Sequence, residues 1–284
     1  MIDHGYEGKL ESNEFDLTII IPVFNEVRRI ADGLEVLKAS IERGELGGIS
    51  IEVFVVDDGS TDDTADKATK LVASLPHSAV IRLPKNRGKG AAIRAGINQA
   101  RGKVVAFMDV DMAVHPSQLV TLLDALGESD VAIGSRSLPG SATRGDTFHR
   151  VVMGRTFTRI VKLLIDLPYR DTQCGFKTFR ISAARILFHD TGIDRFAFDV
   201  DVLARAHRMG LRVTEIPVVW VQVRGSRIRP VADPISMMAD LFRIRRRRHD
   251  RPNVDPFFSG RTRESNSAPD QARSMSTQSG RMVE

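Results

Sequence analysis

Short runs of apolar, often β-branched residues alternate with longer amphipathic stretches through the first half of the chain. The apolar runs predict strands over residues 17–24, 51–56, 79–83, 104–108 and 131–133. The stretches between them predict helices over residues 26–43, 62–74, 90–101 and 116–127. Strands that alternate with helices are typical of an α/β domain with a Rossmann-like, mostly parallel sheet flanked by helices. We therefore expect a single domain of this class.

The pattern is looser after residue 137. It predicts a polar loop over residues 139–146, helices over 147–165 and 198–208, a turn over 171–176 and an extended pair over 212–223. The segment 252–284 has too few apolar residues to fold. The expected organisation is a disordered start (1–14), one domain (15–233), a basic amphipathic helix (234–251) and a disordered tail (252–284).

Composition indicates a folded protein without disulfides. Of the 284 residues, 42% are hydrophobic and 27% are charged, which is enough to bury a core and excludes a disordered or collagen-like chain. The single cysteine, Cys174, can form no internal disulfide, so we expect a reducing, cytoplasmic compartment and a packed, unreactive thiol. No apolar run reaches the roughly 18 residues that a membrane span needs, and the chain does not start with the apolar stretch of a signal peptide.

The net charge of +5 is concentrated in one short segment. Six arginines between Arg243 and Arg251, set against Asp250, account for it, so the rest of the chain is formally neutral. A neutral domain and an arginine run without interleaved aromatic residues both argue against a nucleic-acid partner. We expect the basic helix to lie on an anionic membrane surface at its inner, cytoplasmic face, and its packing on the domain is the alternative. The apolar side of the helix would consist of Ile235, Met237, Met238, Leu241, Phe242 and Ile244.

Acidic and basic side chains follow each predicted strand directly. The segments concerned are Asn25-Glu26, Asp57-Asp58-Gly59-Ser60, Lys85–Gly90, Asp109-Val110-Asp111 and Gly134-Ser135-Arg136. The carboxyl ends of parallel strands meet at one edge of a sheet, and ligands of open α/β sheets bind outside that edge. The sequence therefore predicts a ligand site formed by these segments.

The tripeptide Asp109-Val110-Asp111 is the candidate metal site. Both carboxylates emerge where a strand ends, so they can share a hard divalent cation, Mg²⁺ or Mn²⁺, and a solvated turn is the alternative. A cation held by few protein ligands completes its shell with water and substrate phosphate, which indicates a nucleotide diphosphate. The same tripeptide recurs as Asp199-Val200-Asp201 inside a helical pattern, where the two carboxylates point about 200° apart. We expect metal at the first copy only.

Two other segments have both a ligand-binding and a structural interpretation. An acid in Asp57-Asp58-Gly59-Ser60 can accept hydrogen bonds from a base or ribose, or can cap the next helix. The backbone of residues 87–91, with Arg87 and Lys89, can cradle a phosphate at a helix N-terminus. Neither GxxxxGK[ST] nor a GxGxxG after the first strand is present, which disfavours P-loop and dinucleotide-binding proteins.

Eight segments, in this order and spacing, resemble one enzyme family. IIIPVFNE, VVDDGSTDDT, KNRGKGAAIRAG, FMDVDMAV and GSR are similar to the GT-A domain of the inverting glycosyltransferase family 2. RDTQCGFKTF, RFAFDVDVL and VRGSRI resemble the branch that makes polyprenyl-phosphate sugars, the dolichyl-phosphate glucosyltransferases above all. The resemblance covers about residues 17–229 and departs at Met112 and Ala113, where some relatives have a further polar ligand.

The resemblance implies roles for individual residues. Asp109 and Asp111 would hold the metal and, with Asp171 and Arg136, form the catalytic set, while Asp171 or Asp199 would orient the acceptor or the sugar hydroxyls. The residues implied to bind the nucleotide sugar are Pro22, Asn25, Glu26, Asp57, Asp58, Lys89, Asp109 and Val110. Those implied to bind the acceptor phosphate, for which surface salt bridges are the alternative, are Arg136, Arg150, Arg224 and Arg227.

The implied reaction transfers a sugar from a nucleotide diphosphate sugar, with UDP-glucose favoured, to polyprenyl phosphate with inversion. A phosphate monoester is already an anion, so alignment and charge stabilisation can replace a strong general base. N-acetylhexosamine and mannose stay open as the sugar, and a soluble saccharide or protein stays open as the acceptor. An inert fold whose arginines bind nucleic acid is the third hypothesis and fits the neutral domain poorly. A small membrane-protein partner is a second route to the lipid.

Overall fold

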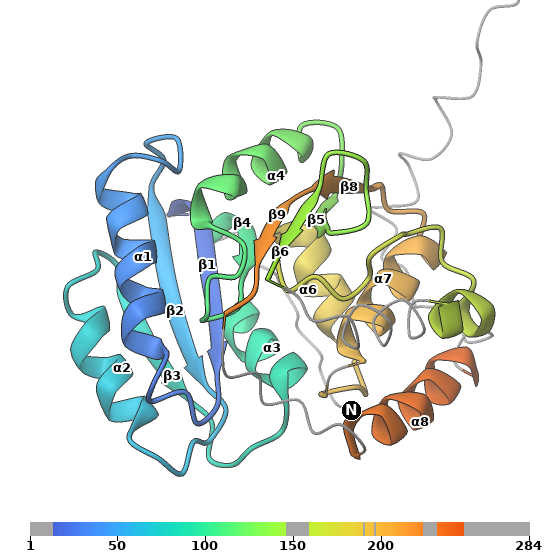
Figure 1. Ribbon diagram of the computed structural model, residues 1–284, viewed down its shortest axis with the longest axis horizontal. Helices are drawn as coiled ribbons and strands as arrows, with labels where there is room; N and C mark the ends of the chain where they lie inside the picture. The colour runs from blue at the N-terminus through green and yellow to red at the C-terminus, as the bar shows by residue number, and fades with distance from the viewer. Residues whose placement is uncertain (1–13, 146–158, 190, 196, 224–231, 247–284) are drawn as a thin grey trace, which may run out of the picture. The chain divides into compact units, whose positions relative to one another are not determined.

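The structure is a computed structural model that describes residues 14–145, 159–189, 191–195, 197–223 and 232–246 (Figure 1). Strands and helices alternate from the start of this part of the chain. The first half contains β1 (Phe15–Val23), α1 (Ile30–Glu42), β2 (Ile51–Asp57), α2 (Thr64–Val72), β3 (Ser78–Arg82), α3 (Lys89–Gln99), β4 (Gly102–Phe107), the 3₁₀ turn η1 (Pro116–Gln118), α4 (Leu119–Ala125) and β5 (Val131–Ser135). The second half contains β6 (Ala142–Arg144), β7 (Lys177–Arg180), α6 (Ile181–His189), α7 (Phe198–Arg208), β8 (Val213–Pro217), β9 (Val219–Val221) and α8 (Ala232–Arg246), and residues 159–165 are also helical.

Seven strands form one sheet in the order β3-β2-β1-β4-β7-β5-β8. Neighbouring strands are parallel except at β7, which runs antiparallel to both β4 and β5. The mostly parallel α/β fold expected from the sequence is confirmed. The sequence pattern missed β7 and the adjoining α6, because β7 is short and begins with a buried charge, Lys177, that interrupts the apolar run.

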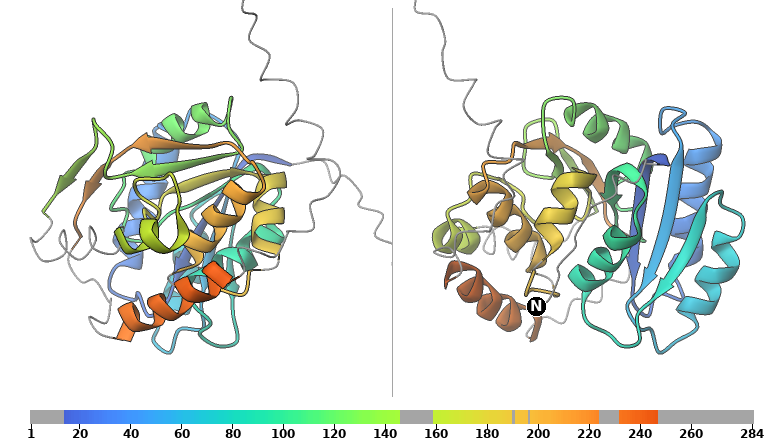
Figure 2. Two further views of the ribbon diagram at one scale, coloured as in Figure 1. Left: turned by 90° about the vertical axis from the view of Figure 1, so that its right-hand side faces the viewer. Right: turned by 180° about the vertical axis from the view of Figure 1, so that it is seen from behind.

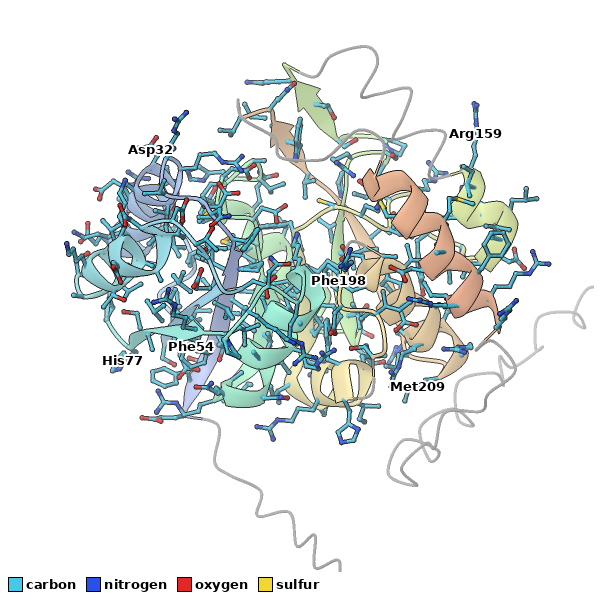
Figure 3. All side chains as sticks on the ribbon, turned by 90° about the horizontal axis from the view of Figure 1, so that it is seen from below. Asp32, Phe54, His77, Arg159, Phe198 and Met209 are labelled. Carbon is cyan, nitrogen blue, oxygen red and sulfur yellow. The ribbon has the colours of Figure 1, made fainter. Side chains whose placement is uncertain are left out.

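Helices cover both faces of the sheet, so the central strands are apolar on both sides. In β1, Ile19 and Ile21 belong to the core beneath α1, α2 and α4, and Ile20 belongs to the core on the opposite face. That second core contains side chains of α3, α6 and α7 and includes Phe198, which Figure 3 labels near the middle of the molecule. Because both faces are packed, polar side chains that are open to a ligand can gather only where the strands end.

A small second sheet connects the fold to the loop after β4. β6 and β9 pair in parallel, and the left view of Figure 2 shows this two-stranded ribbon extending away from the main sheet. The backbone N–H of Val221 in β9 donates a hydrogen bond of 2.7 Å to the carbonyl of Ala113, and Val114 bridges to Trp220. The ribbon therefore supports the segment that follows the Asp109-Val110-Asp111 tripeptide.

The packing of α8 changes the interpretation of the basic helix. Leu241 and Ile244 are buried in the core shared with α7, while Phe242 is exposed. The expectation that Leu241 and Ile244 would face a membrane is wrong, because these side chains complete the domain core; the side chain of Ile235 lies outside what the structure describes. Arg243, Arg245 and Arg246 are exposed in the last turn. Among the described residues no helix combines the length and apolarity that crossing a bilayer requires.

Candidate active site

The carboxyl ends of β1, β2 and β4 bring the predicted site segments to one edge of the sheet. Val23 pairs with Asp57 across β1 and β2, and Met108 donates a backbone hydrogen bond to Ile20 at the end of β4. The loops after these strands carry Glu26, Asp57-Asp58 and Asp109-Val110-Asp111. The edge predicted from the sequence is thus assembled by strand register alone.

The loop of Asp109 and Asp111 is held against helix α1. Gly33 of α1 packs so closely on the carbonyl of Val110 that a Cβ at this position would collide with it, and the side chain of Val110 is buried in the core. Met112 has a left-handed φ of 49°, and the Ala113 N–H donates to Asp111 Oδ1. The chain therefore turns sharply here and leaves both carboxylates at the surface of the edge.

A cation from another element lies against each of these two acids. Lys89, at the start of α3, places Nζ 2.5 Å from Asp109 Oδ1. Arg29, which precedes α1, places Nη1 3.6 Å from Asp111 Oδ2. Arg29 also donates two hydrogen bonds to Glu26, of 2.7 and 2.5 Å. Asp109 and Asp111 are thus each paired with a positively charged side chain.

The pKa values reflect this crowding. Burial opposes the charge of Lys89, but Asp109 and Asp199 outweigh burial and raise the pKa of the ammonium. Burial, together with the neighbouring charge of Asp109, raises the pKa of Asp111, and the Ala113 N–H and Arg29 offset part of that rise. A bound cation would relieve the repulsion between the two carboxylates.

The donor set fits a hard divalent cation. Carboxylate oxygens are the ligands that Mg²⁺ and Mn²⁺ accept, and the side chains of Asp109 and Asp111 are 46% and 22% exposed, so a cation can reach both. Among the residues that the structure describes, no group of three or more His, Cys, Asp or Glu is placed to hold a metal ion by itself. The site therefore suits a cation that takes its remaining ligands from water and phosphate.

Asn25, Asp57 and Asp58 hold the loops at the edge of the sheet. Asn25, at a left-handed φ of 55°, accepts hydrogen bonds from the backbone N–H groups of Thr61 and Asp62. Asp57 is fully buried and accepts from the Ser60 N–H. Carboxylate and amide oxygens can accept more than one hydrogen bond, so these contacts within the protein leave room for bonds to a ligand. The contacts of these residues with a nucleoside stay a prediction. Pro22 lies within β1 one residue before its end.

The predicted backbone cradle for a phosphate at the start of α3 is wrong, whereas the predicted role of the Lys89 charge stays a prediction. Asp58 accepts the N–H groups of Arg87 and Gly88 at 2.9 and 2.7 Å, and the carbonyl of Asp194 accepts the N–H of Gly90 at 2.8 Å. A Cβ at Gly88 would collide with that same carbonyl. The glycines permit close approach of the chain before α7, so this helix N-terminus is capped by the protein itself.

Arg136 and Asp171 form a bidentate ion pair. Arg136 donates from Nε at 2.7 Å and from Nη2 at 3.0 Å to the two carboxylate oxygens, and its backbone N–H donates as well. Burial opposes the charge of Asp171, but these bonds prevail and hold its pKa below the usual range. Asp171 therefore fixes the orientation of the Arg136 guanidinium, and the catalytic role of either side chain stays a prediction.

A second ion pair, between Lys177 and Asp199, is fully buried. Lys177 donates to Asp199 Oδ1 and to the carbonyl of Cys174, both at 2.6 Å. Burial raises the pKa of Asp199, and Lys177 counteracts it. Cys174 is buried, which confirms that it is packed, and burial also raises the pKa of its thiol to about 12. Asp199 lies in helix α7, as its pattern predicted, and does not open into the site.

Three candidate acceptor arginines, Arg150, Arg224 and Arg227, lie outside the described residues. Arg29, Lys177 and Gly175 were not identified from the sequence. A Cβ at Gly175 would collide with the carboxylate of Asp109, so this glycine sets where that acid can lie. The sequence did carry a signal for Arg29: a basic residue at the start of a predicted helix is unfavourable with the helix dipole, and such a residue is a candidate for a functional role. Lys177 could not have been found, since nothing local distinguishes it from a surface lysine.

The comparison with protein families identifies the domain. Residues 18–188, which are more than half of the chain, match the sequence profile of the family described as Glycosyl transferase family 2. The chain belongs to glycosyl transferase family 2. The resemblance based on its motifs and the expected enzyme class, a glycosyltransferase, are both confirmed.

Relatives within this family have names that specify a reaction. The Dolichyl-phosphate beta-glucosyltransferase of Drosophila melanogaster is 36% identical over 248 residues, covering 82% of this family 2 chain and 76% of the relative. The protein of that name from Saccharomyces cerevisiae is 32% identical over 258 residues, covering 83% and 75%. These names agree with the branch that the later motifs resemble.

Solved structures show the same fold. Glucosyl-3-phosphoglycerate synthase from Mycobacterium tuberculosis, in complex with Mn²⁺, UDP-glucose and phosphoglyceric acid, aligns with a TM-score of 0.59. The two sequences are 21% identical, and the alignment covers 81% of this chain and 78% of that one. At this identity the likeness confirms the GT-A fold of the family 2 chain.

Proposed function

We propose that this family 2 chain transfers glucose from UDP-glucose to a polyprenyl monophosphate and uses Mg²⁺ or Mn²⁺. The observation that carries this proposal is the pair Asp109 and Asp111 at the carboxyl end of β4, in a chain 36% identical to a dolichyl-phosphate beta-glucosyltransferase. The neighbouring fold, solved with Mn²⁺ and UDP-glucose, supports the choice of cation class and nucleotide.

The residues at the sheet edge would bind the donor. Asp109 and Asp111 would hold the cation, which supplies positive charge to the diphosphate when bound. Lys89 lies beside Asp109 and would pair with the diphosphate. Under this proposal the nucleoside and sugar contact the backbone around Val110 and the strand ends and loops that carry Pro22, Asn25, Glu26, Asp57 and Asp58.

The acceptor phosphate would attack the anomeric carbon from the side opposite the departing diphosphate. An oxygen of the polyprenyl phosphate forms a bond to the anomeric carbon, the bond from that carbon to the diphosphate breaks, and UDP leaves with the electron pair. Arg136, oriented by Asp171, would align the acceptor phosphate, with Arg150, Arg224 and Arg227 as further candidates. No strong base is required because the attacking oxygen is already anionic, and in-line displacement on the α-linked donor inverts the anomeric carbon and gives a β-linked product.

The lipid acceptor would bring the reaction to the inner face of the membrane. The exposed Arg243, Arg245 and Arg246 at the end of α8 support attraction to anionic lipid, at about 1 kcal/mol for each basic residue near such a surface. Because Leu241 and Ile244 are buried, this attraction would be mainly electrostatic and would weaken with salt. A small membrane-protein partner would serve the same purpose.

The test is a transfer assay with polyprenyl phosphate, Mg²⁺ and a panel of radiolabelled nucleotide sugars, followed by lipid extraction. We expect label in the lipid phase from UDP-glucose, in a β-linkage. Label from GDP-mannose or UDP-N-acetylglucosamine instead would correct the sugar. An α-linked product would contradict single displacement, and label confined to a soluble saccharide or protein would contradict the lipid acceptor.

A further inference from the structure

Arg29 occupies a position that local structure disfavours. It is the N-cap residue of α1, yet its side chain makes no capping hydrogen bond, and its positive charge faces the positive end of the helix dipole. Its side chain is only 19% exposed, so the charge is also largely removed from water. A residue that breaks local rules at this cost is expected where function requires it.

Glu26 holds the guanidinium of Arg29 on the site. Its two carboxylate oxygens accept from Nε and Nη2 of Arg29, which leaves Nη1 3.6 Å from Asp111 Oδ2. Lys89 has the matching place on the other acid, 2.5 Å from Asp109. One cation comes from the start of α1 and the other from the start of α3, so the acid pair lies between them.

From these ion pairs we expect either ligand to bind more weakly alone than together with the other. A divalent cation that arrives by itself must compete with Arg29 and Lys89 for the two carboxylates. A nucleotide diphosphate that arrives by itself meets the negative charges of Asp109 and Asp111. If both arrive, the cation takes the carboxylates and the released side chains pair with the diphosphate oxygens. Because the groups are partly buried, salt screens these interactions little.

We propose that Arg29, together with Lys89, is an exchangeable counter-ion that couples divalent-cation binding to nucleotide-diphosphate binding. Arg29 pairs with Asp111 before the ligands bind and with the diphosphate afterwards. This inference rests on the proposed function for the chemical class of the two ligands and extends it by assigning Arg29.

The experiment measures the binding of Mn²⁺ and UDP separately and together, by calorimetry and by the electron paramagnetic resonance signal of free Mn²⁺. In the wild-type protein, saturating UDP is expected to tighten Mn²⁺ binding about tenfold, within the usual range of coupling between sites. In Arg29→Met, we expect Mn²⁺ alone to bind several-fold more tightly, UDP alone to bind more weakly, and the coupling to fall by most of its value. Arg29→Gln is a second neutral variant with the same expected changes.

Arg28→Met is the matched control, since Arg28 is the adjacent arginine and is exposed. It should bind both ligands as the wild type does, and thermal unfolding of all variants checks the fold. Equal weakening of Mn²⁺ and UDP in Arg29→Met would reduce Arg29 to a structural residue and overturn the inference.

The experiments distinguish a failure of the proposed coupling from a failure of the proposed function. Independent binding of Mn²⁺ and UDP to the wild type would overturn the coupling, while glucosyl transfer to lipid in the same preparation would leave the function standing. Conversely, intact coupling without a lipid product would overturn the acceptor and leave the role of Arg29 standing.

Discussion

The tripeptide Asp-Val-Asp occurs at residues 109–111 and again at 199–201, in two different environments. Asp109 follows β4, its side chain is 46% exposed, and Lys89 faces it across the sheet edge. Asp199 lies in the first turn of α7, its side chain is 6% exposed, and it holds the buried Lys177. The first copy is open to a ligand, whereas the second copy is part of the core.

The difference shows that the secondary-structure position of the tripeptide decides whether its carboxylates are open to a ligand or buried in an ion pair. At a strand end the backbone leaves the sheet, so both carboxylates of the first copy stay at the edge, where a cation and a diphosphate can reach them. In a helix the successive side chains diverge, so the second copy sends Asp199 toward Lys177. An acid that is open to ligand is expected to affect catalysis when changed, and a buried paired acid is expected to affect folding.

The largest effect is expected at the first copy. Asp111→Asn removes a negative ligand and should slow glucosyl transfer roughly 10³-fold, the scale of losing one strong electrostatic contact to developing charge. Its free energy of unfolding should stay within about 1 kcal/mol of the wild type, because the change also relieves repulsion with Asp109. Transfer assays and urea denaturation measure the two quantities.

Asp32→Asn is the control for that comparison, because Asp32 is an exposed acid on α1 that is not among the residues assigned to the site (Figure 3). It should leave both transfer and stability unchanged. Asp201→Asn in the second copy should also reduce transfer much less than Asp111→Asn. Equal losses of turnover for Asp111→Asn and Asp201→Asn would show that the two copies were assigned to the wrong roles.

The next effect concerns the second copy. Asp199→Ala leaves Lys177 buried without its carboxylate and should lower the free energy of unfolding by about 3–5 kcal/mol. The double variant Asp199→Ala, Lys177→Met removes both charges and should recover part of that loss. Urea denaturation decides the matter: if the double variant is no more stable than Asp199→Ala, the penalty does not come from the unpaired ammonium.

A smaller effect is expected at the contact between the two regions. Gly175 lies against Asp109 on the segment that Lys177 holds through the carbonyl of Cys174, so Gly175→Ala should displace the Asp109 carboxylate. A misplacement of about 1 Å can reduce turnover roughly 10²-fold. We expect that loss in the transfer assay together with weaker Mn²⁺ binding. Unchanged Mn²⁺ affinity would mean that the carboxylate adapts to the added methyl group.

The smallest effect is in the pH dependence of stability. Arg136 holds the pKa of Asp171 low in the folded protein, so the unfolded chain binds this proton more readily. The stabilisation is complete above the unfolded pKa, near about 4, and is lost as the pH falls through the lower folded pKa. Denaturation at a series of pH values should show a shallower acid loss for Arg136→Gln than for the wild type. Parallel profiles would mean that the pair contributes nothing to acid stability.

Much of the fold was predictable because buried parallel strands have a strong pattern. The helix over residues 198–208 and the strands β2 and β5 were located within two residues of their observed bounds, since each is an uninterrupted apolar or amphipathic run. β7 was missed because it is short, antiparallel and begins at Lys177. The backbone part of the phosphate cradle was wrong because its glycines allow contact with Asp194, a residue far along the chain.

The sequence by itself determined the sheet, the edge at which polar residues gather and the acid pair Asp109 and Asp111. The physical reason is local: strands packed on both faces are largely apolar, so the charged side chains that a ligand can reach gather beyond the strand ends. Only the tertiary structure decided which acidic and basic side chains form ion pairs with each other. Arg29 faces Asp111, Lys177 faces Asp199 and Arg136 faces Asp171 because strand order and helix packing place distant segments together. Ion pairing depends on a few ångströms in space, and nothing in the local pattern of residues specifies that distance.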